Sequence, residues 1–478
     1  MQHQHSIRIN LKGGILPLNE LFKVTEVLKS FKIRHLSFGL RQQIIIKIPK
    51  GLIAATERKL KEKGLFYQID TNSYPNIVSS FAGEEIFQNG TWLTEGHYKD
   101  LLDGFDFEPS LKVNISDFGQ SLSPYYSGHL NFIASQLPQL WHLAIRFPKT
   151  NEVIHYHQLI QSKDLAKLVG YFEESLATNN ANQQQILAEI PIQFRSQSVV
   201  AGLKTHEFRL PYYEGLNRYG AKTWLGIYRR DEQFSIDFLE EVGQLCLATK
   251  IGQLSLSPWK SLIVKGINES DRMKWSKLLA KHSINVRHAA NELNWQIEDD
   301  SEEALGLKQA LVRYLDSHDL RTFGLCFGIK TRPKTEVFAS VMIRKNPLKF
   351  LGILPLGATY DITYTQDFDP NGRTKIYFAT GILKIHLAEQ LRRAVLLFHQ
   401  KTAKDEIQLL DNEPKKPQTE DQLSALPVMQ CSVCKSKYDP RFGDEFNQIE
   451  IGVLFDNLPA SYQCSLCESP KEVFELLV

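Results

Sequence analysis

Two short stretches near the end of the chain, CSVCKSKYDPRFGD (residues 431–444) and LPASYQCSLCESPKEVF (residues 458–474), each contain a Cys-x-x-Cys pair. The pairs are Cys431/Cys434 and Cys464/Cys467, separated by residues 435–463. Two such knuckles can turn four thiolates towards one ion, and a tetrahedral S4 site suits either zinc or iron. The cysteine spacing therefore predicts a site for one metal ion without selecting the metal.

The residues between the cysteines help to select the metal. They include Tyr438-Asp439-Pro440, Gly443-Asp444, Ile451-Gly452, Phe455, Leu458-Pro459, Tyr462, Lys471 and Phe474. Over residues 429–474 this pattern resembles rubredoxin, a family in which one iron cycles between ferric and ferrous states as a one-electron carrier. The resemblance implies one iron held by all four cysteines, with aromatic side chains packed beneath it in a low-dielectric shell. The alternative is a zinc ribbon that only stabilises the C-terminal region. Tyr438, Phe455, Tyr462 and Phe474 would supply the aromatic core.

The residue after each knuckle departs from the family pattern, which favours glycine there. This chain has Lys435 and Glu468 at the two positions. A left-handed backbone at a non-glycine residue costs roughly 1–2 kcal/mol. Metal capture by comparable zinc sites contributes about 10 kcal/mol or more, so we expect the metal site to form.

Length and composition indicate a globular, multidomain protein. The 478 residues exceed one core of ordinary size, so two to four domains are expected. The 56 basic residues balance the 54 acidic ones, so no electrostatic feature favours nucleic acid or a membrane surface as a partner. The first residues, MQHQHSIRINLKGG, include no apolar signal region. We therefore expect a cytoplasmic protein.

The clearest domain boundary is KTAKDEIQLLDNEPKKPQTEDQLSALP, residues 401–427, which is charged, contains three prolines and lacks aromatic residues. It follows a helical pattern of apolar residues over residues 382–400. We predict a solvated linker over 401–427. Residues 428–478 would then form a small domain that needs its metal, because so small a core rarely stabilises itself.

A weak repeat divides the rest of the chain. IRHLSFGLRQQIIIK (residues 33–47) matches IGQLSLSPWKSLIVK (residues 251–265) at a constant offset of 218, and a helical pattern precedes each copy. This arrangement predicts two homologous α+β halves, residues 1–200 and 201–400, packed around a pseudo-twofold axis.

The repeat unit also resembles a family. GGILPLNELFKVTEVLKSFKIRHLSFGLRQQIIIKI (residues 13–48), SYPNIVSSFAGEEIF (73–87) and LKVNISDFGQSLSPYYSGHLNFIA (111–134) are similar to successive segments of the sirohaem-dependent nitrite and sulfite reductases. The resemblance extends over residues 8–400. In those enzymes sirohaem lies against a four-iron cluster, which a Cys-x5-Cys pair and a Cys-x3-Cys pair hold.

This chain lacks the cysteines that such a cluster requires. The corresponding spacings in the first half are Phe81-x5-Phe87 and Phe118-x3-Leu122. In the second half, residues 294–311 contain no cysteine and Cys326 has no cysteine partner nearby. Because thiolates hold the cluster, we predict that no cluster forms.

The residues that bind anions in the family are also sparse. Arg41 fits the first anion-binding motif of the resemblance, which makes it our candidate sirohaem contact; a solvated arginine at a strand end is the alternative. Pro75 stands where an arginine is expected, and Trp259-Lys260 where Arg-Gln is expected. We predict no catalytic residue in the large region. Cys246 lies in an apolar helical stripe and is expected to be a buried hydrophobe.

These observations favour an electron carrier over an enzyme. In the first hypothesis, the rubredoxin-like domain transfers single electrons and the cluster-less body docks a redox partner, by resemblance a nitrite or nitrate reductase of nitrate assimilation. In the second, the body binds sirohaem without a cluster and the rubredoxin-like domain is its built-in donor, which would make the protein an oxidoreductase. In the third, the small domain binds zinc and the protein is a scaffold or regulator.

Overall fold

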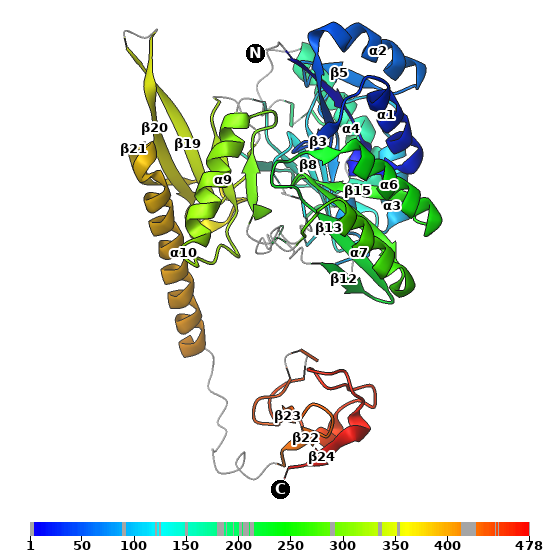
Figure 1. The fold of residues 1–478 in the computed structure, drawn as a ribbon. Coiled ribbons are helices and arrows are strands. Elements are labelled where there is room, and N and C mark those ends of the chain that lie inside the picture. Colours follow the sequence, from blue (N-terminus) through cyan, green and yellow to red (C-terminus); the bar gives the residue numbers. More distant parts are fainter. Residues whose placement is uncertain are drawn as a thin grey trace. The chain divides into compact units, whose positions relative to one another are not determined.

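A computed structural model gives the fold (Figure 1). Contacts divide the chain into two compact units, Met1–Phe398 and His399–Val478, and each is described here by itself. Within the described residues, every helix is too short or too polar to cross a lipid bilayer. The structure describes residues 4–87, 92–119, 122–123, 126–148, 152–178, 186–187, 189–194, 196–199, 203, 210, 215–286, 292–332, 337–350, 354–412, 427–444, 446–447 and 449–477.

The large unit begins with a pair of matching subdomains, one from each half of the chain. Each packs helices against an antiparallel sheet, and the two share one hydrophobic core. The first comprises β1 (Gln4–Ile9), β2 (Ile15–Pro17), α1 (Leu18–Ser30), β3 (His35–Phe38), β4 (Ile44–Pro49), α2 (Ile53–Glu62) and β5 (Tyr67–Ile69). The second comprises β12 (Leu216–Tyr219), β13 (Lys222–Ile227), β14 (Phe234–Ser235), α6 (Ile236–Ala248), β15 (Gln253–Ser257), β16 (Ser261–Ile267) and α7 (Arg272–Lys281).

The two subdomains exchange short strands reciprocally. β2 of the first half pairs with β15 of the second, and β14 of the second half pairs with β3 of the first. The equivalent helices α1 and α6 begin at Leu18 and Ile236, 218 residues apart, which is the offset of the sequence repeat. The predicted pseudo-symmetric α+β halves are therefore confirmed.

Each half then adds a mixed sheet of the same topology. In both, the first three strands run parallel and the next is antiparallel, as β6-β7-β8-β9 and as β17-β18-β19-β20. The first sheet and its helices are β6 (Val78–Ser79), α3 (Glu95–Asp103), β7 (Val113–Ser116), β8 (Leu130–Ala134), β9 (Leu140–Ile145), β10 (Ile154–His155), β11 (Ile160–Gln161) and α4 (Leu165–Thr178). The second comprises β17 (Trp295–Ile297), α9 (Glu302–Asp316), β18 (Phe327–Lys330), β19 (Val341–Phe350), β20 (Leu354–Thr365) and β21 (Lys375–Leu383), followed by α10 (Lys384–Asn412).

Helix α10 enters the segment that was predicted to be a linker. It ends at Asn412, so residues 401–412 are helical, and residues 413–426 lie outside the described residues. The extension has a local cause, because KTAKDEIQLLDN consists mainly of good helix formers and the first proline, Pro414, comes only after it.

The small unit contains a three-stranded antiparallel sheet in the order β23-β22-β24. Turns and short 3-10 helices make up much of the rest, around a core of aromatic residues and cysteines. The strands are β22 (Met429–Cys431), β23 (Lys437–Tyr438) and β24 (Phe474–Leu476).

Candidate metal centre

The four predicted ligands of the small unit converge. Sγ of Cys431 lies 3.7 Å from Sγ of Cys467, and Sγ of Cys434 lies 3.5 Å from Sγ of Cys464. All four sulfurs lie within 4.8 Å of one another. A tetrahedral ion with metal–sulfur bonds of about 2.3 Å separates its sulfurs by roughly 3.8 Å, so the four cysteines fit one metal ion.

The two knuckles have the same backbone geometry. The amide of Lys435 donates to the carbonyl of Cys431 at 2.9 Å, and the amide of Glu468 donates to that of Cys464 at 2.8 Å. Lys435 and Glu468 adopt φ angles of 64° and 59°. Both non-glycine residues therefore occupy the left-handed conformation in which the family uses glycine, and the tight turn that orients the sulfurs is kept.

An aromatic cluster packs beneath the site, as predicted. Tyr438, Phe455, Tyr462 and Phe474 are buried, and their ring centroids lie 5.0–6.0 Å apart. The two hydroxyls are satisfied, since Tyr438 donates to the carbonyl of Val453 and Tyr462 to the carboxylate of Asp444, each at 2.8 Å. The cluster supplies a low-dielectric wall on one side of the sulfurs.

The sulfurs differ in exposure to solvent. Cys431 and Cys464, which begin the knuckles, are buried, whereas Cys434 and Cys467 are half-buried. The Ser436 hydroxyl and a backbone amide lower the pKa of the Cys434 thiol to about 6, which favours the thiolate that binds metal. One edge of the site thus reaches the surface.

Comparison with known proteins agrees with this geometry. The rubredoxin family model matches residues 428–474. Residues 428–474 form a rubredoxin domain. Its four cysteines are positioned to bind one iron, and the predicted iron site is confirmed.

Curated relatives match the same region. The chain is 43% identical over 54 residues to a probable rubredoxin HupJ of Rhodobacter capsulatus, covering 11% of this chain and 19% of that protein. It is 43% identical over 47 residues to a rubredoxin in an uptake hydrogenase operon of Azotobacter chroococcum mcd 1, covering 10% and 65%. A third relative is an anaerobic nitric oxide reductase flavorubredoxin of Enterobacter sp. (strain 638), 37% identical over 51 residues, with coverage of 11% of each chain. The chain thus spans less than two thirds of each of these relatives.

The chain also matches a solved structure, that of the Mycobacterium tuberculosis NirA protein. The TM-score is 0.59 at 13% sequence identity, with 87% of this chain and 82% of that chain covered. At this identity the similarity establishes the fold, and the predicted nitrite/sulfite reductase-like fold is confirmed. We call the unit Met1–Phe398 the reductase-like body.

The two remaining cysteines of the chain lie far from the rubredoxin ligands in sequence and in separate cores of the body. Cys246 belongs to the core that the two antiparallel subdomains share, and Cys326 to a second cluster. Burial raises the pKa of Cys246 to about 12 and that of Cys326 even further. Both thiols therefore stay protonated and suit packing rather than metal binding.

The positions that correspond to cluster ligands in the reductase resemblance are filled by other groups. Phe81 and Leu122 are fully buried in the apolar cores of the body. The β17–α9 turn carries Glu298, whose carboxylate accepts hydrogen bonds from the amides of Thr331 and Arg332 at 3.0 and 2.9 Å. The described residues of the body thus do not fit an iron–sulfur cluster.

Arg41 is buried, so the alternative of a solvated strand-end arginine is wrong. Its guanidinium donates to the carbonyl of Asn76 at 2.7 and 2.9 Å and to that of Val113 at 2.9 Å. These bonds anchor the β3–β4 turn to the first mixed sheet. A contact between Arg41 and sirohaem stays a prediction.

An ion-pair network that the sequence reading missed joins the two halves. Lys260 lies 2.7 Å from Glu232 and 3.4 Å from Asp299, and Asp299 also pairs with Arg8 at 3.3 Å. Burial disfavours the Lys260 ammonium, but the two carboxylates outweigh that effect and raise its pKa. The sequence offered one hint of the role of Lys260. At the repeat offset of 218, Lys260 is the equivalent of Gln42 in the first copy.

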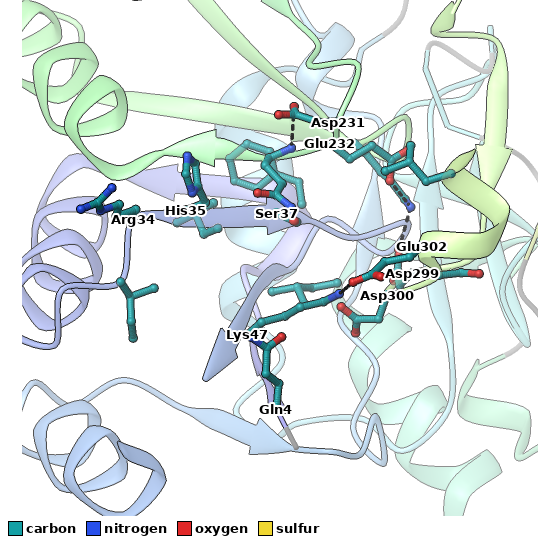
Figure 2. A pocket seen from close by; sticks show the side chains of 18 residues that line it. Gln4, Arg34, His35, Ser37, Lys47, Asp231, Glu232, Asp299, Asp300 and Glu302 are labelled. Atoms are coloured by element: carbon teal, nitrogen blue, oxygen red, sulfur yellow. Dashed lines mark hydrogen bonds and ion pairs between the residues drawn. The ribbon is translucent and has the colours of Figure 1, made fainter. Parts of the chain in front are cut away.

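This network borders a cavity of about 310 Å³ (Figure 2). Asp231, Glu232, Asp299, Asp300 and Glu302 line it together with Lys47, which lies 3.5 Å from Glu302. Lys260 pairs with Glu232 and Asp299, and Lys47 pairs with Glu302, so part of the cavity wall consists of ion pairs.

A second polar region of the body gathers positive charge. Lys330 and Arg344 are cross-strand neighbours on β18 and β19, an unfavourable placement for like charges. Burial and the cations Lys375 and Arg344 lower the pKa of Lys330 to about 8. Among the described residues, the side-chain amide of Asn371 and Nε of Arg373 are buried without a hydrogen-bond partner. Such a region is suited to an anionic ligand.

Proposed function

We propose that this protein is a one-electron carrier in which the rubredoxin domain accepts and passes on electrons, while the reductase-like body docks a redox partner and is itself not catalytic. The convergence of four cysteine sulfurs over an aromatic core carries the proposal. The body supports it, because apolar side chains and a carboxylate clamp occupy the places of cluster ligands.

The rubredoxin domain has a defined edge for electron exchange. Cys434 and Cys467 are half-buried, and the knuckle residues Val433 and Leu466 are 64% and 72% exposed. Iron, when bound, supplies the one-electron chemistry. The chain holds the sulfurs, excludes water on the aromatic side, and presents an apolar rim where a partner can approach closely.

The charge of the domain suggests the chemistry of its partner. Residues 428–478 contain eight acidic and four basic residues, so a partner surface with basic groups would complement it and steer the encounter. Because the domain and body belong to one chain, a partner docked on the body would meet the domain at an effective concentration in the mM range. We place the protein in nitrate or nitrite assimilation, with a nitrite or nitrate reductase as the partner.

Stopped-flow reoxidation tests this proposal. The full chain is loaded with iron, reduced, and mixed with an assimilatory nitrite or nitrate reductase and its substrate. We expect the reductase to accelerate reoxidation at least tenfold, and added salt to slow it. A Cys431→Ser, Cys434→Ser variant is the control without the metal site. Reoxidation at the same rate with and without either reductase would contradict the proposed setting.

The positively charged region of the body favours a second candidate, a sirohaem protein with a built-in rubredoxin donor. Lys330, Arg344 and Arg373 would hold the carboxylates of the macrocycle, which supplies electron-accepting chemistry when bound. Expression alongside sirohaem synthesis tests this candidate. A Soret band that co-purifies with the wild type and is lost in Lys330→Glu, Arg373→Glu supports it, and its absence from the wild type refutes it.

A further inference from the structure

The two knuckles of the rubredoxin domain end in the same residue. They read Cys-Ser-Val-Cys-Lys-Ser over residues 431–436 and Cys-Ser-Leu-Cys-Glu-Ser over residues 464–469. The hydroxyl of each final serine lies within hydrogen-bonding distance of a cysteine sulfur. Oγ of Ser436 lies 3.2 Å from Sγ of Cys434 and 2.9 Å from Sγ of Cys464. Oγ of Ser469 lies 3.2 Å from Sγ of Cys467.

The backbone fixes these serines in place. The amide of Cys431 donates to the carbonyl of Ser436 at 2.9 Å, and the amide of Cys464 donates to that of Ser469 at 2.8 Å. Both serines are half-buried, so their hydroxyls face the sulfurs from within the folded knuckle. The contacts are therefore a consequence of the turn geometry of each knuckle.

The chemistry of the two groups sets the direction of the hydrogen bond. A metal-bound thiolate has no proton to give, whereas a serine hydroxyl can donate one. One-electron reduction adds one negative charge to the iron and its four thiolates. Donors aimed at the sulfurs stabilise the more negative, reduced state more than the oxidised state, and such bonds are one means by which proteins set the potential of iron–sulfur sites.

We propose that Ser436 and Ser469 are positioning residues that raise the reduction potential of the iron site through hydroxyl–sulfur hydrogen bonds. The effect of Ser436 is the larger, because its one hydroxyl proton has a sulfur at 2.9 Å to point to, that of Cys464, whereas the sulfur nearest to the Ser469 hydroxyl is at 3.2 Å. This inference rests on the proposed function, since it requires iron that cycles by one electron.

Redox titration of the iron-loaded full chain tests the inference. The variants are Ser436→Ala, Ser469→Ala and the double variant. Ser432→Ala and Ser465→Ala are matched controls, because these serines belong to the same knuckles, whereas the serine–sulfur contacts among the described residues of the domain are those of Ser436 and Ser469. Ser436→Thr, which keeps the hydroxyl, is the conservative variant. The visible absorption of ferric thiolate verifies that each variant keeps its site.

We expect Ser436→Ala to lower the ratio of reduced to oxidised protein about tenfold at a fixed poise, which for a one-electron couple is 59 mV. Ser469→Ala should give a smaller shift in the same direction, and both controls and Ser436→Thr should stay at the wild-type potential. Alanine variants that match their controls would overturn the inference. If Ser436→Ala does not retain iron, the reduction potentials of Ser469→Ala and Ser465→Ala are compared instead, and equal potentials would overturn the inference. A wild type without reversible reduction would instead refute the proposed function.

Discussion

At the scale of the residue, Lys435 and Glu468 show what the metal site tolerates. Both follow the second cysteine of a knuckle, both have positive φ, and both donate the amide hydrogen bond that closes the turn. The strain of about 1–2 kcal/mol per residue is small beside the free energy of metal binding. The site therefore persists with side chains that put one positive and one negative charge at the knuckles.

Removing this strain should stabilise the rubredoxin domain. We predict that Lys435→Gly and Glu468→Gly each add about 0.5–1 kcal/mol to its stability, because the relief of strain exceeds the greater chain entropy of glycine in the unfolded state. The midpoint of thermal loss of the ferric-thiolate absorption measures the effect in the full chain. Lys437→Gly is the control, since Lys437 is an exposed strand residue outside the left-handed region, and it should destabilise. A lower midpoint for both test variants would contradict the prediction.

The residue scale also shows how far sequence reasoning reaches. The ligands and aromatic core of the metal site were predictable because they lie within 46 residues and follow a dense pattern. The environment of Arg41 was not, because its partners are the carbonyls of Asn76 and Val113, which only the tertiary fold brings to the β3–β4 turn. The contacts of the Ser436 and Ser469 hydroxyls with the sulfurs were also missed, because serine at these positions is not part of the pattern by which the chain resembles rubredoxin.

At the scale of the element, the halves are joined by reciprocal interactions. Lys47 pairs with Glu302 at 3.5 Å and Lys265 pairs with Glu84 at 3.3 Å. Each member of the first pair is 218 residues from its counterpart in the second, and each pair crosses between the halves. Together with the exchanged strands β2 and β14, these pairs make the halves interdependent, so the body should unfold as one unit.

Gln42 is the residue through which this interdependence can be tested. It is fully buried, donates to the carbonyls of Ser79 and Leu256 at 3.0 and 2.6 Å, and accepts from the amide of Ser79 at 2.9 Å. Without this side chain, the backbone groups of Ser79 in the first half and the carbonyl of Leu256 in the second half would be buried without these hydrogen bonds. We predict that Gln42→Ala destabilises the body by about 2–3 kcal/mol.

Guanidinium unfolding followed by tryptophan fluorescence measures this loss, because all six tryptophans lie in the body and none in the rubredoxin domain. Gln136→Ala, at an exposed glutamine of the same body, should change stability by less than about 0.5 kcal/mol. An equal effect of the two substitutions, or separate transitions for the two halves, would contradict the interdependence.

Element boundaries were less predictable than the repeat itself. The offset of 218 and the helical pattern before each copy predicted the pseudo-symmetry. The spacing of apolar residues stays recognisable in the two copies even where few of their residues are identical. The end of α10 was misplaced, because the charged composition of residues 401–412 also suits a solvated helix. The Lys260 network could not be predicted, because its acidic partners Glu232 and Asp299 come from two separate loops that only the tertiary fold brings together.

At the scale of the whole molecule, redox ligands and reductase-like fold are divided between two units. The rubredoxin domain holds the four converging cysteines, whereas the body has a nitrite/sulfite reductase-like fold in which Cys246 and Cys326 are buried apart from each other. We propose that electrons enter and leave this protein at Cys431, Cys434, Cys464 and Cys467.

The most direct test is metal analysis combined with a visible spectrum of the full chain purified from iron-supplied cells. We predict one iron per chain, no inorganic sulfide, and a ferric-thiolate absorption that one electron bleaches and reoxidation restores. The Cys434→Ser variant, purified in the same way, should lack this reversible ferric-thiolate absorption. Zinc without visible absorption, iron that does not cycle, or a sulfide-containing cluster in the cysteine variant would contradict the claim.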